Sequence, residues 1–192
     1  MSKWPKPIHY GLLLLIIGGI LGGLLVLVNS ITAPIIAENE IREVKPKLEA
    51  LVPTCDTFEI VTDQLGTLPN GVKEVYYGYE DDVVKAVIYW TETAAYGTLV
   101  MKELVAIDVT TNKIINVAIT STPLTTHGKD MDFDVYKTFF KDVDVLTYNN
   151  ASIDDFSNQN PEIISGATVS SKGVVMGVII ATTHYLAHDW SF

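Results

Sequence analysis

Four small residues near the C-terminal end of the chain, Ser165, Gly166, Ala167 and Thr168, precede a long apolar stretch. A hydroxyl at the start of a helix accepts a backbone N–H hydrogen bond, so either Ser165 or Thr168 can serve as an N-cap. Gly166 and Ala167 carry almost no side chain, and they let a bulky group approach the backbone closely. Because backbone N–H groups at a helix start favour negative charge, the segment suits a phosphate-linked cofactor. The same residues also make an ordinary cap and turn, and short motifs often match by chance.

The segment from Ile164 to Val174 resembles the flavinylation motif of the FMN-binding domain family, in which the phosphate of FMN is joined to the threonine of Ser/Thr-Gly-Ala-Thr. The resemblance implies that Thr168 carries a covalent FMN as a phosphoester. It also implies that neighbouring residues of the motif bind the cofactor, namely Ser165, Gly166, Ala167, Val169 and Ser170.

A second segment, around Thr122 and Pro123, resembles the family in part. Family members have Glu-Thr-Pro-Gly-Leu-Gly here, and that segment packs against the flavin. Thr122 matches its threonine, whereas Ser121 stands in the place of the glutamate and the glycines are missing or shifted. The resemblance implies that Leu124 or Thr125 takes the place of the leucine against the ring. From the residues alone, the segment is a turn that begins at a proline.

Two more positions resemble the family with a change. Tyr96 stands in a stretch similar to the family's Gly-Tyr-Gly, with Ala95 where glycine is usual. Tyr96 is therefore either part of the flavin pocket or an ordinary aromatic residue at the end of a strand. Glu162, three residues before Ser165, stands where the family often has aspartate, so a carboxylate is kept with a longer side chain.

The 19 residues from Tyr10 to Val28 carry no charge, which is about the length needed to cross the hydrocarbon core of a membrane. Lys3 and Lys6 precede them, and Glu38 is the first acidic residue after them. This bias predicts a cytoplasmic N-terminus and an extracytoplasmic C-terminal domain, with one span of the inner or cytoplasmic membrane. A cleaved signal peptide has a shorter apolar region and a clear cleavage site, so we favour a retained anchor.

The middle of the chain predicts an antiparallel meander. Four segments rich in Val, Ile, Tyr and Thr have the composition of strands, namely residues 72–79, 83–90, 99–109 and 114–120. Turn residues separate the first pair at 80–82 and the last pair at 111–113. Strands do not alternate with helices and no Gly-x-Gly-x-x-Gly is present, which argues against a Rossmann nucleotide site.

Helices are predicted on both sides of these strands in the sequence. Residues 130–141 mix aromatic and charged side chains as an amphipathic helix does. Asp154, Asp155 and residues 158–160 predict a polar loop. Residues 169–186 are apolar on nearly every face, so this helix is either buried or a second membrane span. Its Ser, Thr, Lys and His residues favour burial.

The predicted fold class is α+β, with one transmembrane helix followed by an FMN-binding domain of an antiparallel sheet and flanking helices. The predicted boundaries are a cytoplasmic N-terminus at 1–9, an anchor helix at 10–30, a connector helix at 31–55 and the domain at 56–192.

Composition excludes several classes of function. The net charge of -10 argues against nucleic-acid binding, which needs clusters of Lys and Arg. The chain has a single cysteine, Cys55, which rules out an intrachain disulfide and cysteine-based metal sites. Cys55 follows Pro53 in a predicted turn, and we expect an exposed thiol. No residues stand at metal-ligand spacing, so no metal site is predicted.

No nucleophile with a paired base is evident, so the chemistry would belong to the flavin. The resemblance implies electron transfer through FMN among the flavins and iron–sulfur centres of neighbouring membrane subunits. The short chain is most similar to the G-type subunits of Rnf complexes, which couple electron flow between ferredoxin and NAD to movement of Na⁺ or H⁺. A separate flavin transferase would attach the FMN.

Other functions remain open. The chain is alternatively a stand-alone membrane-anchored FMN carrier, or a C-type subunit of Na⁺-translocating NADH:quinone oxidoreductase. An alternative of another class is a cofactor-free, membrane-tethered binding or assembly module, in which Ser165 and Thr168 only cap a helix.

Overall fold

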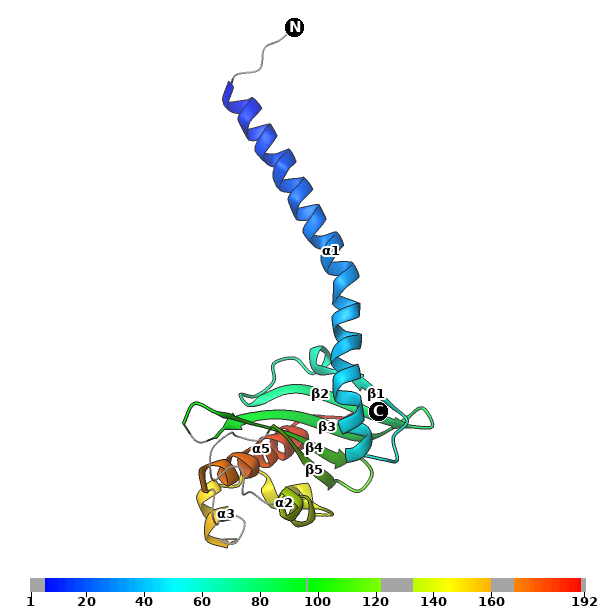
Figure 1. The fold of residues 1–192 in the computed structure, drawn as a ribbon, viewed down its shortest axis with the longest axis vertical. Coiled ribbons are helices and arrows are strands. Elements are labelled where there is room, and N and C mark those ends of the chain that lie inside the picture. The colour runs from blue at the N-terminus through cyan, green and yellow to red at the C-terminus, as the bar shows by residue number, and fades with distance from the viewer. Residues whose placement is uncertain (1–5, 96, 122–132, 160–167, 191–192) are drawn as a thin grey trace. The chain divides into compact units, whose positions relative to one another are not determined.

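The computed structural model describes residues 6–95, 97–121, 133–159 and 168–190 (Figure 1). It contains two units, residues 1–43 and residues 44–192. The predictions for Ser165, Gly166, Ala167 and for Tyr96 lie outside the described residues, as do those for 122–125 and Glu162.

The first unit consists of most of helix α1, which runs from Lys6 to Leu51. Within it, Tyr10–Ser30 is long and apolar enough to cross a membrane, and none of this stretch is buried against protein. This is consistent with the predicted single-pass anchor. α1 continues without a break through Pro34 and through most of the stretch predicted as a separate connector helix. The last residues of α1, from Val44 onward, belong to the second unit.

The second unit is built on a five-stranded antiparallel sheet in the order β1-β2-β3-β4-β5. The strands are β1 (Thr57–Ile60), β2 (Val72–Glu80), β3 (Val83–Ala94), β4 (Val100–Asp108) and β5 (Lys113–Ser121). The helices are α2 (Phe133–Phe140), α3 (Ile153–Gln159) and α5 (Thr168–Ala187), with 3-10 turns η1 (Thr62–Gln64) and η3 (Val145–Tyr148). The predicted α+β class and the antiparallel meander are confirmed. The predicted polar loop after residue 153 is wrong, because Asp154 and Asp155 form the first turn of α3.

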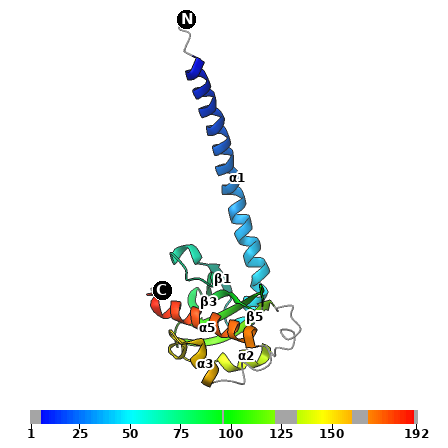
Figure 2. The same cartoon turned by 90° about the vertical axis from the view of Figure 1, so that its left-hand side faces the viewer.

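The two faces of the sheet are covered by different helices. Along β3, Val87 belongs to one hydrophobic core, and its neighbours Ala86 and Ile88 belong to the other. The first core includes residues of α2, α3 and α5, and Figure 2 shows α2 and α5 on the same side of the sheet. The second core includes Val44 and Leu48 from the end of α1. Both faces are therefore buried, which explains the nearly continuous apolar runs in β3 and β4.

Cys55 is buried with 5% of its surface exposed, so the expectation of an exposed thiol is wrong. The chain turns sharply after α1, where the amide of Cys55 donates to Val52 O at 3.1 Å and that of Asp56 donates to Tyr79 O at 2.8 Å. This turn places the thiol against Gly78 of β2, where a Cβ atom would lie 2.8 Å from Cys55 Sγ. Burial raises the pKa of the Cys55 thiol.

Candidate functional site

Helix α5 carries the predicted attachment residue at its first position. Thr168 begins the helix and is exposed to solvent, and Val169 is 46% exposed. From Ser170 onward the helix enters the domain, and most of its central residues are buried, including Val174, Val175 and Val178. The prediction of a buried helix rather than a second membrane span is therefore confirmed. Thr168 thus stands at the solvent-facing N-terminus of a helix whose body is part of the core.

Two glycines let α5 approach the sheet closely. A Cβ atom on Gly173 would lie 2.8 Å from Ala94 O, and the Thr93 hydroxyl donates to Gly173 O at 2.8 Å. A Cβ atom on Gly177 would overlap Glu103 Oε1, far inside van der Waals contact. These two contacts fix the depth at which α5 packs on the sheet.

The first turns of α5 are also held by a buried hydrogen bond. Tyr136 of α2 donates its hydroxyl to Ser171 Oγ at 2.6 Å, and Ser171 is completely buried. Ser170 is 3% exposed, so its side chain belongs to the interior, in contrast to Thr168 and Val169. The predicted cofactor residues that the structure describes therefore divide into two exposed residues at the helix start and one buried residue behind them.

The electrostatics at the start of α5 suit an anionic group. The first turn contains no acidic residue, so the positive end of the helix dipole is not neutralised within it. Lys172 lies four residues after Thr168 and therefore on the same side of the helix. Its Nζ lies 3.6 Å from Asp154 Oδ1, an ion pair with a strongly exposed carboxylate. An exposed threonine hydroxyl, a first turn without acidic residues and a nearby ammonium together fit a phosphoester.

Comparison with known proteins shows similarity to a subunit of a redox complex. The G-type subunit of the proton-translocating ferredoxin:NAD(+) oxidoreductase complex of Clostridium ljungdahlii is 29% identical to this chain over 161 residues, covering 82% of this chain and 80% of the relative. This chain is a homologue of the G-type subunit of Rnf complexes. No family model matches the chain.

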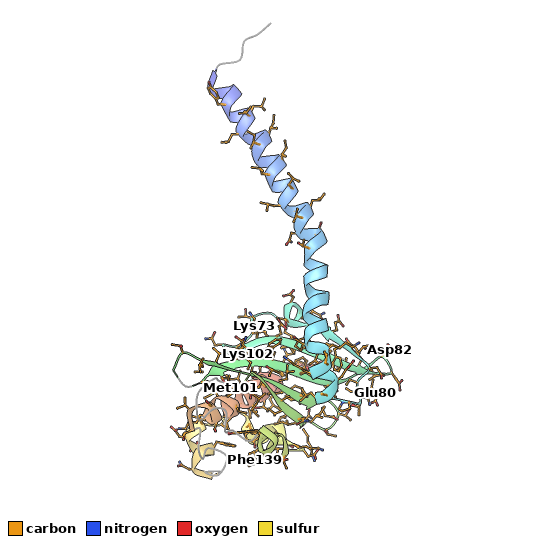
Figure 3. All side chains as sticks on the ribbon, in the orientation of Figure 1. Lys73, Glu80, Asp82, Met101, Lys102 and Phe139 are labelled. Carbon is orange, nitrogen blue, oxygen red and sulfur yellow. The ribbon has the colours of Figure 1, made fainter. Side chains whose placement is uncertain are left out.

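One buried group beneath the middle of α5 was not predicted from the sequence. Glu103 of β4 is fully buried beneath α5. Glu103 lies on the same face of β4 as Met101 and Val105, which belong to the first core. Lys102 points to the opposite face, where its Nζ pairs with Glu92 Oε1 at 3.1 Å (Figure 3). A carboxylate at an inward position of an apolar strand is a period-two signal that was available in the sequence.

A cleft of about 520 Å³ lies beside the C-terminal half of α5, away from Thr168. It is lined mainly by apolar side chains of α5, such as Ile179 and Ile180, with Asn70 and His184 among its polar groups. The Tyr89 hydroxyl lies 3.0 Å from His184 Nδ1. Burial lowers the pKa of His184, so the cleft has a neutral lining that does not resemble a phosphate site. Among the residues that the structure describes, no cluster could hold a metal ion.

Proposed function

We propose that this chain is an electron-transfer subunit of an Rnf-type membrane complex, a ferredoxin:NAD oxidoreductase that translocates ions, and that it carries FMN on Thr168. Two observations support the proposal. The homology to the Clostridium ljungdahlii subunit extends over most of both chains. Thr168 is exposed at the positive end of a helix whose first turn contains no acidic residue and whose body is buried in the core.

The residues of α5 would bind and orient the cofactor rather than react. The Thr168 oxygen would carry the phosphate of FMN, the backbone N–H groups of the first turn would stabilise the phosphate charge, and Lys172 would add a cation one turn away. Val169, exposed beside Thr168, offers an apolar contact outside the phosphate. When bound, FMN supplies uptake and release of one or two electrons. The buried contacts of Gly173, Gly177 and Ser171 keep this helix start in place.

The apolar stretch Tyr10–Ser30 would hold the subunit in the membrane. The lysines that precede it favour a cytoplasmic N-terminus and an extracytoplasmic FMN domain. The partners are then the other membrane and iron–sulfur subunits of the complex, and a flavin transferase that loads Thr168.

The proposal is tested by producing the full chain together with a flavin transferase and recording flavin fluorescence in a denaturing gel. The wild-type band should fluoresce, because a phosphoester survives denaturation. Thr168→Ala should be dark while keeping its fold, since the hydroxyl is exposed. Thr110→Ala is the matched control: it removes another threonine hydroxyl outside the core, in the turn between β4 and β5, and should fluoresce like the wild type.

Each other outcome has a defined meaning. Fluorescence in Thr168→Ala would place the flavin elsewhere and contradict the attachment site. A dark wild-type band would contradict covalent FMN and favour the cofactor-free binding module. A fluorescent protein that purifies from its native membranes without other redox subunits would favour the stand-alone carrier.

A further inference from the structure

Glu103 is completely buried between the sheet and helix α5. Its Oε1 accepts a hydrogen bond from the Thr91 hydroxyl at 3.1 Å across the β3–β4 ladder. Its Oε2 has no hydrogen-bond partner among the residues that the structure describes. A carboxyl group with one neutral donor is poorly satisfied, whether judged as an ion or as a hydrogen-bonding group.

The packing leaves no room for solvent or a counter-ion on the α5 side of this carboxyl. Gly177 lies directly over it, so closely that a Cβ atom there would overlap Glu103 Oε1 and lie 2.6 Å from Thr91 Oγ1. On the other side of β4, the residue paired with Glu103 is Ile119 of β5, which is apolar. The helix thus rests on the carboxyl itself.

The charged and titratable groups around Glu103 offer it no cation among the described residues. On α2, the titratable group that faces it is Tyr136, whose pKa a negative charge on Glu103 raises. On β3, the buried phenol of Tyr89 stands two residues from Thr91. On α5, Lys172 pairs with Asp154 and His184 lies against Tyr89. A buried carboxylate without a cation is strongly disfavoured, so the group binds a proton instead. Burial accordingly raises the pKa of Glu103 well above its ordinary value of 4.5, and the Thr91 hydrogen bond opposes this only in part.

We propose that Glu103 is a buried proton site that holds a neutral carboxylic acid, and that this proton lets α5 sit at its observed depth on the sheet. Loss of the proton would place an uncompensated negative charge beneath Gly177. α5 would then move away from β3 and β4 to admit water, and Thr168 would move with it. Glu103 is therefore a positioning residue for the start of α5; its effect on a cofactor there rests on the proposed function.

The direction of the pH effect follows from the raised pKa. A group whose pKa is higher in the folded state stabilises that state fully at pH below its unfolded pKa. The contribution is lost as the pH rises through the folded pKa. For one proton, the population of the opened state increases about tenfold per pH unit between these two pKa values. Glutamine has nearly the same shape but does not titrate, so Glu103→Gln should abolish the pH dependence.

The test compares the full-length wild type, Glu103→Gln and a matched control, Glu92→Gln, in detergent. Glu92 is on the same ladder, but it is partly exposed and ion-paired with Lys102. Infrared spectra should show a protonated-carboxyl band at neutral pH in the wild type and in Glu92→Gln that is missing in Glu103→Gln. Hydrogen exchange of the α5 amides, compared between variants at equal pH, should match at low pH. Between the ordinary pKa of 4.5 and the raised pKa of the closed protein, the ratio of the wild-type rate to the Glu103→Gln rate should increase about tenfold per pH unit, and above the raised pKa it should level off.

Two results would overturn the proposal. One is an infrared spectrum in which Glu103→Gln loses no carboxyl band at neutral pH. The other is a ratio of α5 exchange rates that is independent of pH. Neither readout needs flavin, so a failure of covalent FMN leaves the Glu103 result intact. In flavin-loaded protein, the pH dependence of flavin fluorescence should be weaker in Glu103→Gln than in the wild type, while the flavin stays attached in a denaturing gel.

Discussion

The two faces of the sheet are packed in different ways. The face beneath the end of α1 is lined by apolar side chains and the thiol of Cys55. The face beneath α5 also contains buried polar groups, among them Thr91, Thr93 and Glu103 from the strands and Ser171 from the helix. The first face can hold the end of α1 through the hydrophobic effect alone. The second depends on hydrogen bonds, glycine contacts and a proton, so it is the face that can respond to pH.

The largest expected change in the free energy of unfolding comes from the apolar face beneath the end of α1. Leu48→Ala removes a completely buried side chain from the end of α1 and should lower the free energy of unfolding by about 3 kcal/mol. Because Leu48 does not titrate and burial raises the pKa of the neighbouring Cys55 thiol, the loss should be the same from acid to neutral pH. Denaturant titrations of the variant and the wild type at several pH values would measure it. A loss that varies with pH would show that the two faces are coupled.

Gly177→Ala should destabilise the packing of α5 on the sheet through a steric clash. The new Cβ would collide with Glu103 Oε1, and the expected loss is about 2 kcal/mol, because overpacking costs more than the roughly 1 kcal/mol that alanine gains in a helix. Thermal unfolding would measure it. Shortening residue 103 should relieve the collision, so Gly177→Ala combined with Glu103→Ala should be less destabilised than the sum of the single variants. Additive losses would contradict direct contact between the two positions.

Thr93→Val tests a smaller contribution on the same face. It removes the hydroxyl that donates to Gly173 O while keeping the shape of the side chain, and should cost about 1 kcal/mol. The amides of the first turns of α5 should exchange faster, and Thr168 should still accept FMN. An unchanged exchange rate would mean that the glycine contacts alone hold the helix start.

The strands were predictable because their signals are local. The runs that begin at Val72 and Val83 became β2 and β3, separated by a two-residue turn in which Asp81 and Asp82 adopt positive φ values of 50° and 61°. The C-terminal helix was predicted within one residue at each end, since its apolar run is long and continuous.

What could not be predicted depends on contacts between distant segments. Cys55 looked like part of an exposed turn, and only the packing of that turn on β2 buries it. The short edge strand β1 forms because it pairs with β2, and its own composition does not indicate a strand. At the candidate site, the sequence indicated Thr168 but not Glu103, because a charged residue within a strand is usually assigned to the exposed face.

The decisive measurement for the proposed cofactor site is the mass of the tryptic peptide that spans residues 142–172 and carries Thr168. The protein should be made with a flavin transferase, and the peptide fragmented so that the modified residue is located. We expect the added mass of FMN less one water on Thr168, and a peptide of unmodified mass from Thr168→Ala. An unmodified wild-type peptide, or flavin located on another residue, would contradict the assignment of Thr168, presented by α5, as the attachment point of the cofactor.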